Sequence, residues 1–115
     1  NIPDTQFKCA HAATGKILWE EDMQWQEAGR THGLFRGSLL QADGRVFCLG
    51  EDGVLAELKV SPKGAKILQK ARLFSARSSW TLPTLHKGLL YVSQNEADLL
   101  TRAPPRIICY DFRGE

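Results

Sequence analysis

Internal repetition is the feature that most constrains how this chain can fold. Gly15 and Gly64, each in a turn before an apolar run, lie 49 positions apart, and Gly44 and Gly88, each at the start of another apolar run, lie 44 apart. A third element recurs near residues 9–11, 57–59 and 109–111. Three kinds of element therefore recur in one order, at a spacing of about 40–50 residues. A period of this length indicates a repeat unit of several short secondary-structure elements.

The turn residues predict that these elements are strands. Short apolar runs alternate with Asp-Gly, Lys-Gly or Pro-containing turns, and no long stretch has the 3.6-residue period of a helix. The clearest hairpin joins 45–49 to 54–60 through a turn that contains Gly50 and Gly53, and glycine supplies the positive φ angles of tight turns. The first strand is apolar almost throughout, as expected for a strand that is covered on both faces of the sheet. In the second strand, apolar residues alternate with less apolar ones, as in a half-buried strand. This pairing suggests stacked sheets.

The fold class expected from this pattern is all-β, a partial β-propeller with about two and a half four-stranded antiparallel blades. Residues 1–29 would supply the outer strands of one blade, residues 30–74 a complete blade, and residues 75–115 a last blade that lacks its outer strand. The strands are expected at 7–11, 16–20, 38–41, 45–49, 54–60, 66–70, 81–85, 89–93 and 106–112. Residues 96–105 should form an exposed loop. Blades bury their faces against neighbours, so the isolated chain is expected to aggregate.

Residues 9–19, Cys-Ala-His-Ala-Ala-Thr-Gly-Lys-Ile-Leu-Trp, resemble the propeller repeat of pyrroloquinoline-quinone (PQQ) proteins, A-x-D-x-x-T-G-x-x-x-W. Thr14, Gly15 and Trp19 match this pattern, whereas Cys9 and His11 replace its Ala and Asp. The resemblance implies that Thr-Gly forms the turn between the outer two strands and that the Trp packs between blades. In the next unit, Leu68 is expected to stand where the Trp should be. The structural repeat motif expected in this chain comprises Thr14, Gly15, Trp19, Gly64 and Asp111.

The C-terminal part extends the resemblance. Residues 80–84, 89–92 and 107–111 are similar to the final blade of bacterial members of this superfamily, which are often described as similar to the lipoprotein of the outer-membrane β-barrel assembly machinery. The resemblance implies a non-catalytic, protein-binding scaffold in the periplasm or cell envelope. Its partner would be another protein or the missing blades of the same propeller.

Enzymatic members of the family bind the quinone and a calcium ion in the central channel and use an Asp base beside a disulfide of adjacent cysteines. This chain has no adjacent cysteines, and Asp111 is placed near a strand end. We therefore expect no catalytic, cofactor-binding or metal-binding residue here. The alternative is a quinone-dependent dehydrogenase whose catalytic residues lie in blades outside this chain. A third interpretation is a sensor domain joined to another module.

Loops that enter the innermost strands would line one face of a propeller and the mouth of its channel. They carry the candidate contact residues, which are Arg30, His32, Arg36, Arg77 and Trp80. The alternative is that these are ordinary polar loops, with Trp80 packing between blades. Glu20-Glu21-Asp22 is expected to be a solvated loop, with a cation site as its alternative.

The composition argues against several partners. The chain has 15 basic and 13 acidic residues, and its net charge of +2 lacks the clustered basic face of a nucleic-acid-binding protein. No apolar run approaches the roughly 18 residues that a membrane span needs. Cys9, Cys48 and Cys109 are far apart, and each lies in an apolar stretch, where we expect a small buried side chain.

Overall fold

The computed structural model describes residues 6–34, 36–42, 44–77 and 81–113. In these segments the chain forms strands and turns without a helix, and every strand pair is antiparallel. The expected all-β class is therefore confirmed. With no helix in the described segments, none is long and apolar enough to cross a membrane.

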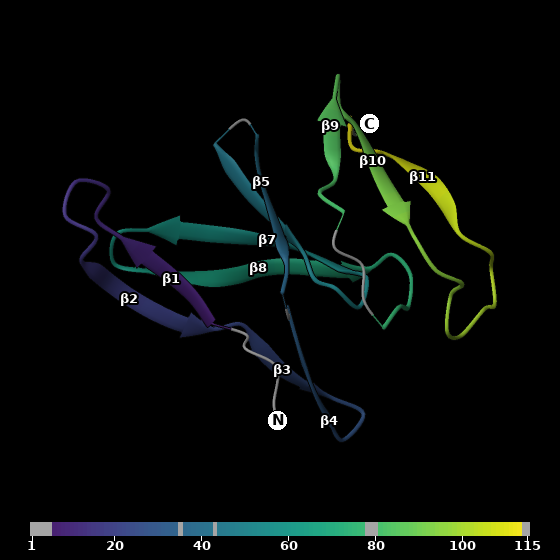
Figure 1. Ribbon diagram of the computed structural model, residues 1–115, viewed down its shortest axis with the longest axis horizontal. Helices are drawn as coiled ribbons and strands as arrows, with labels where there is room; N and C mark the ends of the chain where they lie inside the picture. The colour runs from purple at the N-terminus through teal and green to yellow at the C-terminus, as the bar shows by residue number, and fades with distance from the viewer. Residues whose placement is uncertain (1–5, 35, 43, 78–80, 114–115) are drawn as a thin grey trace.

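Within these described segments, eleven strands form four sheets, whose arrangement is drawn in Figure 1. The strands are β1 (Gln6–Ala10), β2 (Ile17–Asp22), β3 (Gln24–Glu27), β4 (Arg30–Gly33), β5 (Ser38–Ala42), β6 (Arg45–Leu49), β7 (Val54–Ser61), β8 (Gly64–Arg72), β9 (Thr84–His86), β10 (Leu89–Gln94) and β11 (Arg106–Asp111). The sheets are β1-β2, β3-β4, β5-β6-β7-β8 and β11-β10-β9. The four strands expected between residues 38 and 70 thus form one continuous sheet, the central sheet.

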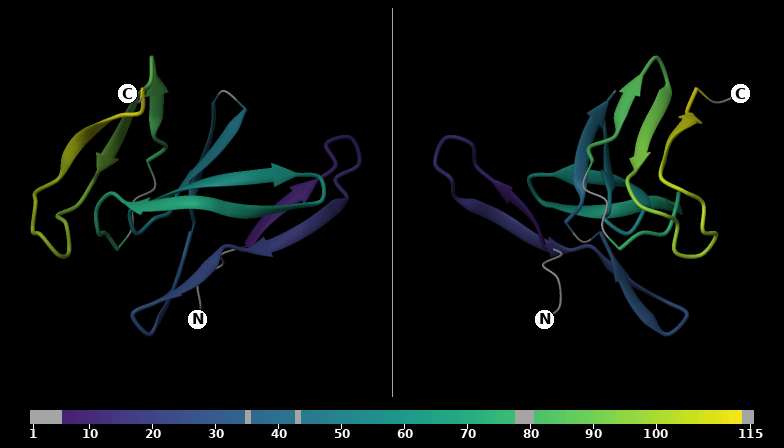
Figure 2. Two further views of the ribbon diagram at one scale, coloured as in Figure 1. Left: turned by 180° about the vertical axis from the view of Figure 1, so that it is seen from behind. Right: turned by 45° about the vertical axis from the view of Figure 1, so that its right-hand side comes forward.

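The central sheet is covered on both faces. Phe47 and Leu55 of one face form a buried cluster with Leu90 and Val92 of β10. Residues on the other face pack against the N-terminal strands, and their cluster contains Cys48, Ala56, Leu58, Met23 and Phe7. Figures 1 and 2 show the N-terminal strands and the β9–β11 sheet on opposite sides of the central sheet. The prediction of stacked sheets is confirmed, but residues 54–58 are buried throughout rather than alternating, because both faces are covered.

The β3–β4 hairpin was not expected from the sequence. Residues 29–33 were interpreted as a loop, whereas β4 occupies 30–33 and pairs with β3. Its turn contains Ala28 and Gly29, with φ angles of 52° and 77°, which suits a tight two-residue hairpin turn. Both strands are largely polar, so no apolar alternation revealed them. Glu20-Glu21-Asp22 was likewise expected to be a loop and instead completes β2.

The repeat inferred from the sequence reappears in the strand registers. Each residue pair between β9 and β10 matches a pair between β5 and β6 when both residues of the latter are shifted by 44 positions. The matched pairs are Ala42↔Arg45 with His86↔Leu89, Gln41↔Val46 with Leu85↔Leu90, and Leu40↔Phe47 with Thr84↔Tyr91. Two hairpins of different sequence therefore have the same alignment.

The next hairpin repeats in the same way. Each β6–β7 pair matches a β10–β11 pair when β6 is shifted by 44 positions and β7 by 52. The matched pairs are Val46↔Leu58 with Leu90↔Tyr110, Phe47↔Glu57 with Tyr91↔Cys109, Cys48↔Ala56 with Val92↔Ile108, and Leu49↔Leu55 with Ser93↔Ile107. The β9–β11 sheet thus reproduces the first three strands of the central sheet.

The β1–β2 sheet reproduces the last two strands of the central sheet. All five β1–β2 pairs match β7–β8 pairs when β1 is shifted by 48 positions and β2 by 50. Both pairings have a register shift at the matching point, between Cys9 and Ala10 and between Glu57 and Leu58. The extra residues there are Leu18 and Leu68. Gln69, rather than Leu68 as expected, therefore stands at the place of Trp19.

Candidate functional site

Several connections between strands meet at one end of the central sheet. We call this region the loop edge and define it as residues 36–37, 50–53, 73–77 and 95–105. Backbone hydrogen bonds connect its segments: the Ala76 N–H donates to the Asp52 carbonyl at 3.1 Å, and the Leu73 N–H donates to the Gly53 carbonyl at 2.9 Å. Loops that are positioned in this way by a rigid sheet are common places for binding residues.

Asp98 anchors the longest connection to the rest of the loop edge. Its side chain is 4% exposed and accepts hydrogen bonds from the N–H groups of Ser75, Leu100 and Thr101, each at 2.8 Å. Hydrogen bonds to the ionised form favour it, and the bonds from Thr101 and Ser75 lower the pKa of Asp98 to about 2. Residues 96–105 are thus a mostly exposed loop, as expected, but one with a buried ionised anchor.

The turn that follows Asp98 displays two leucines. The Arg102 N–H donates to the Asp98 carbonyl at 3.0 Å, and Arg102 has a left-handed φ of 65°. This closes one turn of helix-like backbone over residues 98–102, with Asp98 in the position of an N-cap. At its tip Leu99 is 42% exposed and Leu100 is 77% exposed. Sequence reasoning missed this feature, although Asp followed by Leu-Leu-Thr-Arg carries the capping signal.

Two of the candidate contact residues, Arg36 and Arg77, lie on the loop edge. The Arg36 guanidinium lies 3.7 Å from the Glu51 carboxylate, and its side chain is 57% exposed while that of Glu51 is 10% exposed. The Arg77 side chain is exposed, and its backbone N–H donates to Oε1 of Glu96 at 2.6 Å. Both arginines can therefore offer positive charge to a partner from an ordered backbone.

The loop edge also contains the carboxylate of Asp52. The Asp52 carboxylate lies 3.5 Å from the guanidinium of Arg72, which also donates to the Asp52 carbonyl at 3.2 Å. The other carboxylate oxygen of Asp52, Oδ1, is buried and has no hydrogen-bond partner among the described residues. An unsatisfied buried acceptor costs free energy, so a water molecule or a partner's donor would be favoured there.

Arg30 and His32 lie away from the loop edge, on β4. The His32 ring stacks on Trp25 of β3, with ring centroids 6.2 Å apart and an interplanar angle of 15°. The Lys70 ammonium lies 4.9 Å from the centre of the Trp25 ring, so a cation–π contact joins this hairpin to β8. His32 therefore has a packing role in the structure. Trp80, the remaining candidate, lies outside the described residues.

Of the expected repeat motif, Thr14 and Gly15 lie in the turn between β1 and β2, and Trp19 lies on β2. Gly15 has a left-handed φ of 74°, and the Thr14 hydroxyl accepts from the Lys16 N–H at 3.3 Å, so both shape the turn between β1 and β2. The Trp19 indole donates to the Ser61 carbonyl at 2.8 Å and joins β2 to the β7–β8 turn. Gly64 begins β8 directly after that turn, with a φ of 157°.

Asp111 lies at the end of β11, where it binds its neighbour Arg113. The two side chains form a pair with an N–O distance of 2.7 Å, and the Arg113 N–H donates to the same carboxylate at 2.9 Å. The side-chain bonds and the backbone bond from Arg113 lower the pKa of Asp111 to about 2.

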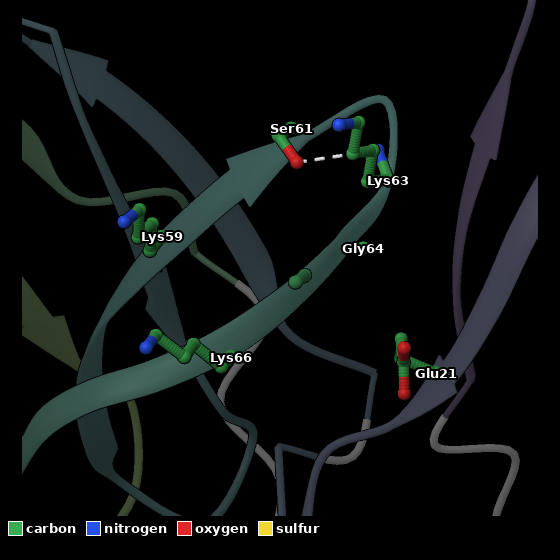
Figure 3. A pocket seen from close by; sticks show the side chains of 7 residues that line it. Glu21, Lys59, Ser61, Lys63, Gly64 and Lys66 are labelled. Atoms are coloured by element: carbon green, nitrogen blue, oxygen red, sulfur yellow. Dashed lines mark hydrogen bonds between the residues drawn. The ribbon is translucent and has the colours of Figure 1, made fainter.

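A hollow of about 280 Å³ beside the β7–β8 turn carries several charged residues. Lys59 and Lys66 are directly opposite each other in the sheet, an arrangement that is unfavourable for like charges. Figure 3 shows their ammonium groups pointing away from Glu21, which lies across the hollow on β2. The charges do not converge on one point, and this hollow is not a convincing ligand site.

The described residues contain no group of three or more His, Cys, Asp or Glu side chains that could hold a metal ion. Cys48 is fully buried, as expected, and burial raises the pKa of its thiol to about 12, which makes it unreactive. Cys9 is partly buried, but Cys109 is exposed, so the expectation of burial is wrong for Cys109.

Comparison of the chain with protein-family models, with curated proteins and with solved structures finds no match in any of the three.

Proposed function

We propose that this chain forms part of a quinoprotein-like β-propeller that serves as a non-catalytic, protein-binding scaffold in the periplasm or cell envelope. Its architecture supports a propeller, because parts of the four-strand register recur before and after the central sheet, two strands before it and three after it. Neighbouring sheets also stack face to face. The envelope location rests on the resemblance of residues 9–19 and of the C-terminal strands.

The observation that carries the scaffold function is the ordered apolar tip of the loop edge. Fully burying a leucine side chain against a partner is worth about 1.5–3 kcal/mol. The entropy cost of ordering the loop would offset little of this binding free energy, because the hydrogen bonds of Asp98 already fix the loop backbone. Leu100, 77% exposed, would be the central anchor, with Arg77 supplying polar contacts beside it. This combination suits a protein surface with an apolar pocket and acidic groups around it.

Site-specific photo-crosslinking in the intact protein, in the cells that produce it, tests this proposal. A photoreactive residue at position 100 is expected to capture one reproducible protein partner. Leu68 is the matched control, since it is a leucine, 53% exposed, on the edge strand β8 and away from the loop edge. Equal capture at both positions, or no capture at position 100, would contradict the proposed contact surface.

A separate assay distinguishes the scaffold from a dehydrogenase. The intact protein, supplied with the quinone and calcium, is tested for reduction of an electron-accepting dye in the presence of alcohols and sugars. We expect no quinone- and calcium-dependent activity. Dye reduction that depends on both would instead indicate a quinone-dependent dehydrogenase, with its active site formed by residues outside this chain.

A further inference from the structure

The free edge of β1 borders an apolar groove. Among the residues that the structure describes, β1 pairs only with β2. Beside it lies a groove of about 440 Å³ between the β1–β2 sheet and strands β5, β6 and β7. The apolar residues that line it include Phe7, Ala10, Trp19, Leu39, Val46 and Val60. Leu39 is 52% exposed and Val60 is 45% exposed, so the groove leaves sizeable apolar side chains in water.

The internal repeat specifies what belongs in this groove. β1 corresponds to β7 at all five matched pairs, including the shared register shift. In the central sheet, the equivalent edge of β7 is occupied by β6, which is in turn paired with β5. The β10–β11 pairing has the same register as β6–β7. In both units where the second and third strands are described, these two strands therefore pair in the same register.

We propose that the β1 edge and its groove accept an antiparallel β-hairpin with the pattern of β5–β6, supplied by a polypeptide segment of the same repeat type. The second strand of that hairpin pairs with β1. Its residues opposite Phe7, Cys9 and Ala10 correspond to Leu49, Phe47 and Val46 of the central sheet. Its apolar side chains then cover Leu39 and Val60, as β9–β11 covers the opposite face of the central sheet.

The chemistry of the occupant follows from this alignment. The second strand of the unit reads Val-Phe-Cys-Leu in β6 and Leu-Tyr-Val-Ser in β10, an apolar run with few polar residues. Main-chain hydrogen bonds from the open edge would provide affinity, and the pockets for alternate side chains would provide selectivity. The inference rests on strand registers and does not depend on the loop edge or on the scaffold function.

A second copy of the chain is a poor source of this hairpin. Its own β9–β10 hairpin has the right pattern, but β10 is already paired along its whole length with β11. The β5–β6 hairpin is enclosed in the same way within the central sheet. Releasing either one would expose the buried residues Leu90 and Val92 or Cys48 and Leu49. Homodimerisation through this edge is therefore an outcome that would count against the proposal.

The test adds a hairpin of this pattern to the chain. A copy of residues 38–53 is placed directly before Gln6, in place of residues 1–5, because the turn 50–53 leads into Val54 and Val54 corresponds to Gln6. The added copy carries Cys48→Val, as the equivalent Val92 allows, so that it contributes no thiol. We expect the free-edge amides of residues 7–10 to exchange with solvent roughly tenfold more slowly than in the parent chain. The thiol of Cys9 should also react more slowly.

The matched control is the same extended chain with Phe47→Lys and Leu49→Lys in the added copy only. It keeps the length and the backbone but cannot fill the groove, so exchange at residues 7–10 should stay at the parent rate. Protection of β7–β8 amides verifies that the central sheet is folded in each variant. The same sequence is also added to the parent chain as a separate synthetic peptide, in case the fusion does not fold.

The outcomes are distinct. Slower exchange at β1 with the apolar hairpin, and not with the lysine control, supports the proposal in either format. Unchanged β1 exchange in both formats, or equal protection by the lysine control, would overturn it. None of these results bears on capture of a partner at Leu100, so the scaffold proposal stands or fails separately.

Discussion

At the scale of single residues, Asp98 and Trp19 each join parts of the chain that are distant in sequence. Asp98 links the 95–105 connection to Ser75, 23 residues away, and Trp19 reaches Ser61, 42 residues away. Both do so with one polar group directed at a backbone atom. Such hydrogen bonds stabilise the arrangement of neighbouring sheets rather than any single sheet. Their loss is expected to weaken the contact between the two segments that they join.

The pKa of Asp98 leads to a pH prediction. Its folded pKa of about 2 is below the ordinary value of 3.8, so the stabilisation from its ionised anchor is present above 3.8 and is lost as the pH falls through about 2. The amide chemical shifts of Leu100 and Thr101 should therefore titrate with a midpoint near 2. Asp98→Ala should abolish that titration, whereas Asp111→Asn, which removes another carboxyl with a lowered pKa, should leave it. A midpoint near 3.8 would contradict the anchor.

Trp19 provides a test of the contact between neighbouring sheets. Trp19→Phe keeps an aromatic ring but removes the indole N–H that donates to the Ser61 carbonyl. We expect a loss of about 0.5–1 kcal/mol in the free energy of unfolding, at the low end for a hydrogen bond because this one is exposed to solvent. Urea unfolding measures it. Tyr91→Phe, at an exposed aromatic residue, should change the stability by less than about 0.5 kcal/mol.

At the scale of elements, equivalent strands differ in what covers them. Leu55 on β7 and Ile107 on β11 occupy the same place in the repeat, opposite Leu49 and Ser93. Leu55 is 6% exposed because β9–β11 packs over it, whereas Ile107 is 77% exposed. The same position in the unit therefore has different energetic importance in the two sheets.

This difference predicts unequal effects of two matched substitutions. Leu55→Ala should lower the free energy of unfolding by about 2–5 kcal/mol, because it leaves a cavity in the cluster with Phe47 and Leu90. Ile107→Ala should change it by less than about 0.5 kcal/mol. Chemical unfolding of the two variants tests this. A large loss at Ile107 would mean that its face of β11 is covered in solution.

The turn between β6 and β7 should be sensitive at Gly53. This residue has a left-handed φ of 102°, and a Cβ there would collide with the carbonyl of Phe74. Gly53→Ala is expected to cost more than about 2 kcal/mol, since both strain and a backbone clash arise. Gly44→Ala is the matched control, because Gly44 has a φ of 74° but open space around its Cα. Its cost should be only about 1 kcal/mol, and equal losses would contradict the clash.

At the scale of the whole molecule, the described chain is a stack of sheets whose end sheets leave apolar surface exposed. The central sheet has four strands and two covered faces, but the β9–β11 sheet exposes Tyr91 and Ile107, and the β1–β2 sheet leaves the groove beside Leu39 open. Exposed apolar faces of this kind favour association. The chain as it stands should therefore self-associate.

Sedimentation velocity over a range of concentrations tests this last prediction. We expect the mean mass to rise with concentration, and Ile107→Lys to reduce the association because it places a charge on the exposed face of β11. Ala13→Lys, which adds the same single charge at an exposed residue of the β1–β2 turn, serves as the control for net charge. A monodisperse monomer with a sharp, reversible thermal transition would contradict the prediction.

Much of the local structure could be predicted because it depends on short-range chemistry. The glycine turns and apolar runs indicated the strands between residues 38 and 70, and the spacing of Gly44 and Gly88 indicated that they recur. Prediction failed where local pattern carries little information. The polar β3–β4 hairpin has no apolar alternation, and β9 begins only at Thr84, later than expected, since Pro83 before it has no N–H for a strand ladder.

The candidate site was predictable only in part. Arg36 and Arg77 were selected because they precede innermost strands, and both lie on the loop edge. His32 was selected for the same reason but stacks on Trp25. The role of Asp98 depends on Ser75, which is remote in sequence, so no local pattern could reveal that its carboxylate is buried and shared between two connections.

The sequence by itself determined the class of the fold, the unit that repeats and most of the strand positions, because turn preferences and apolar periodicity act within a few residues. Only the tertiary structure decided the registers, the burial of residues 54–58, the β3–β4 hairpin and the anchoring of the loop edge. It also decided that Leu55 is covered while Ile107 is not. Burial is a property of what lies across the interface, and a residue's own neighbours in sequence do not specify which sheet will pack against it.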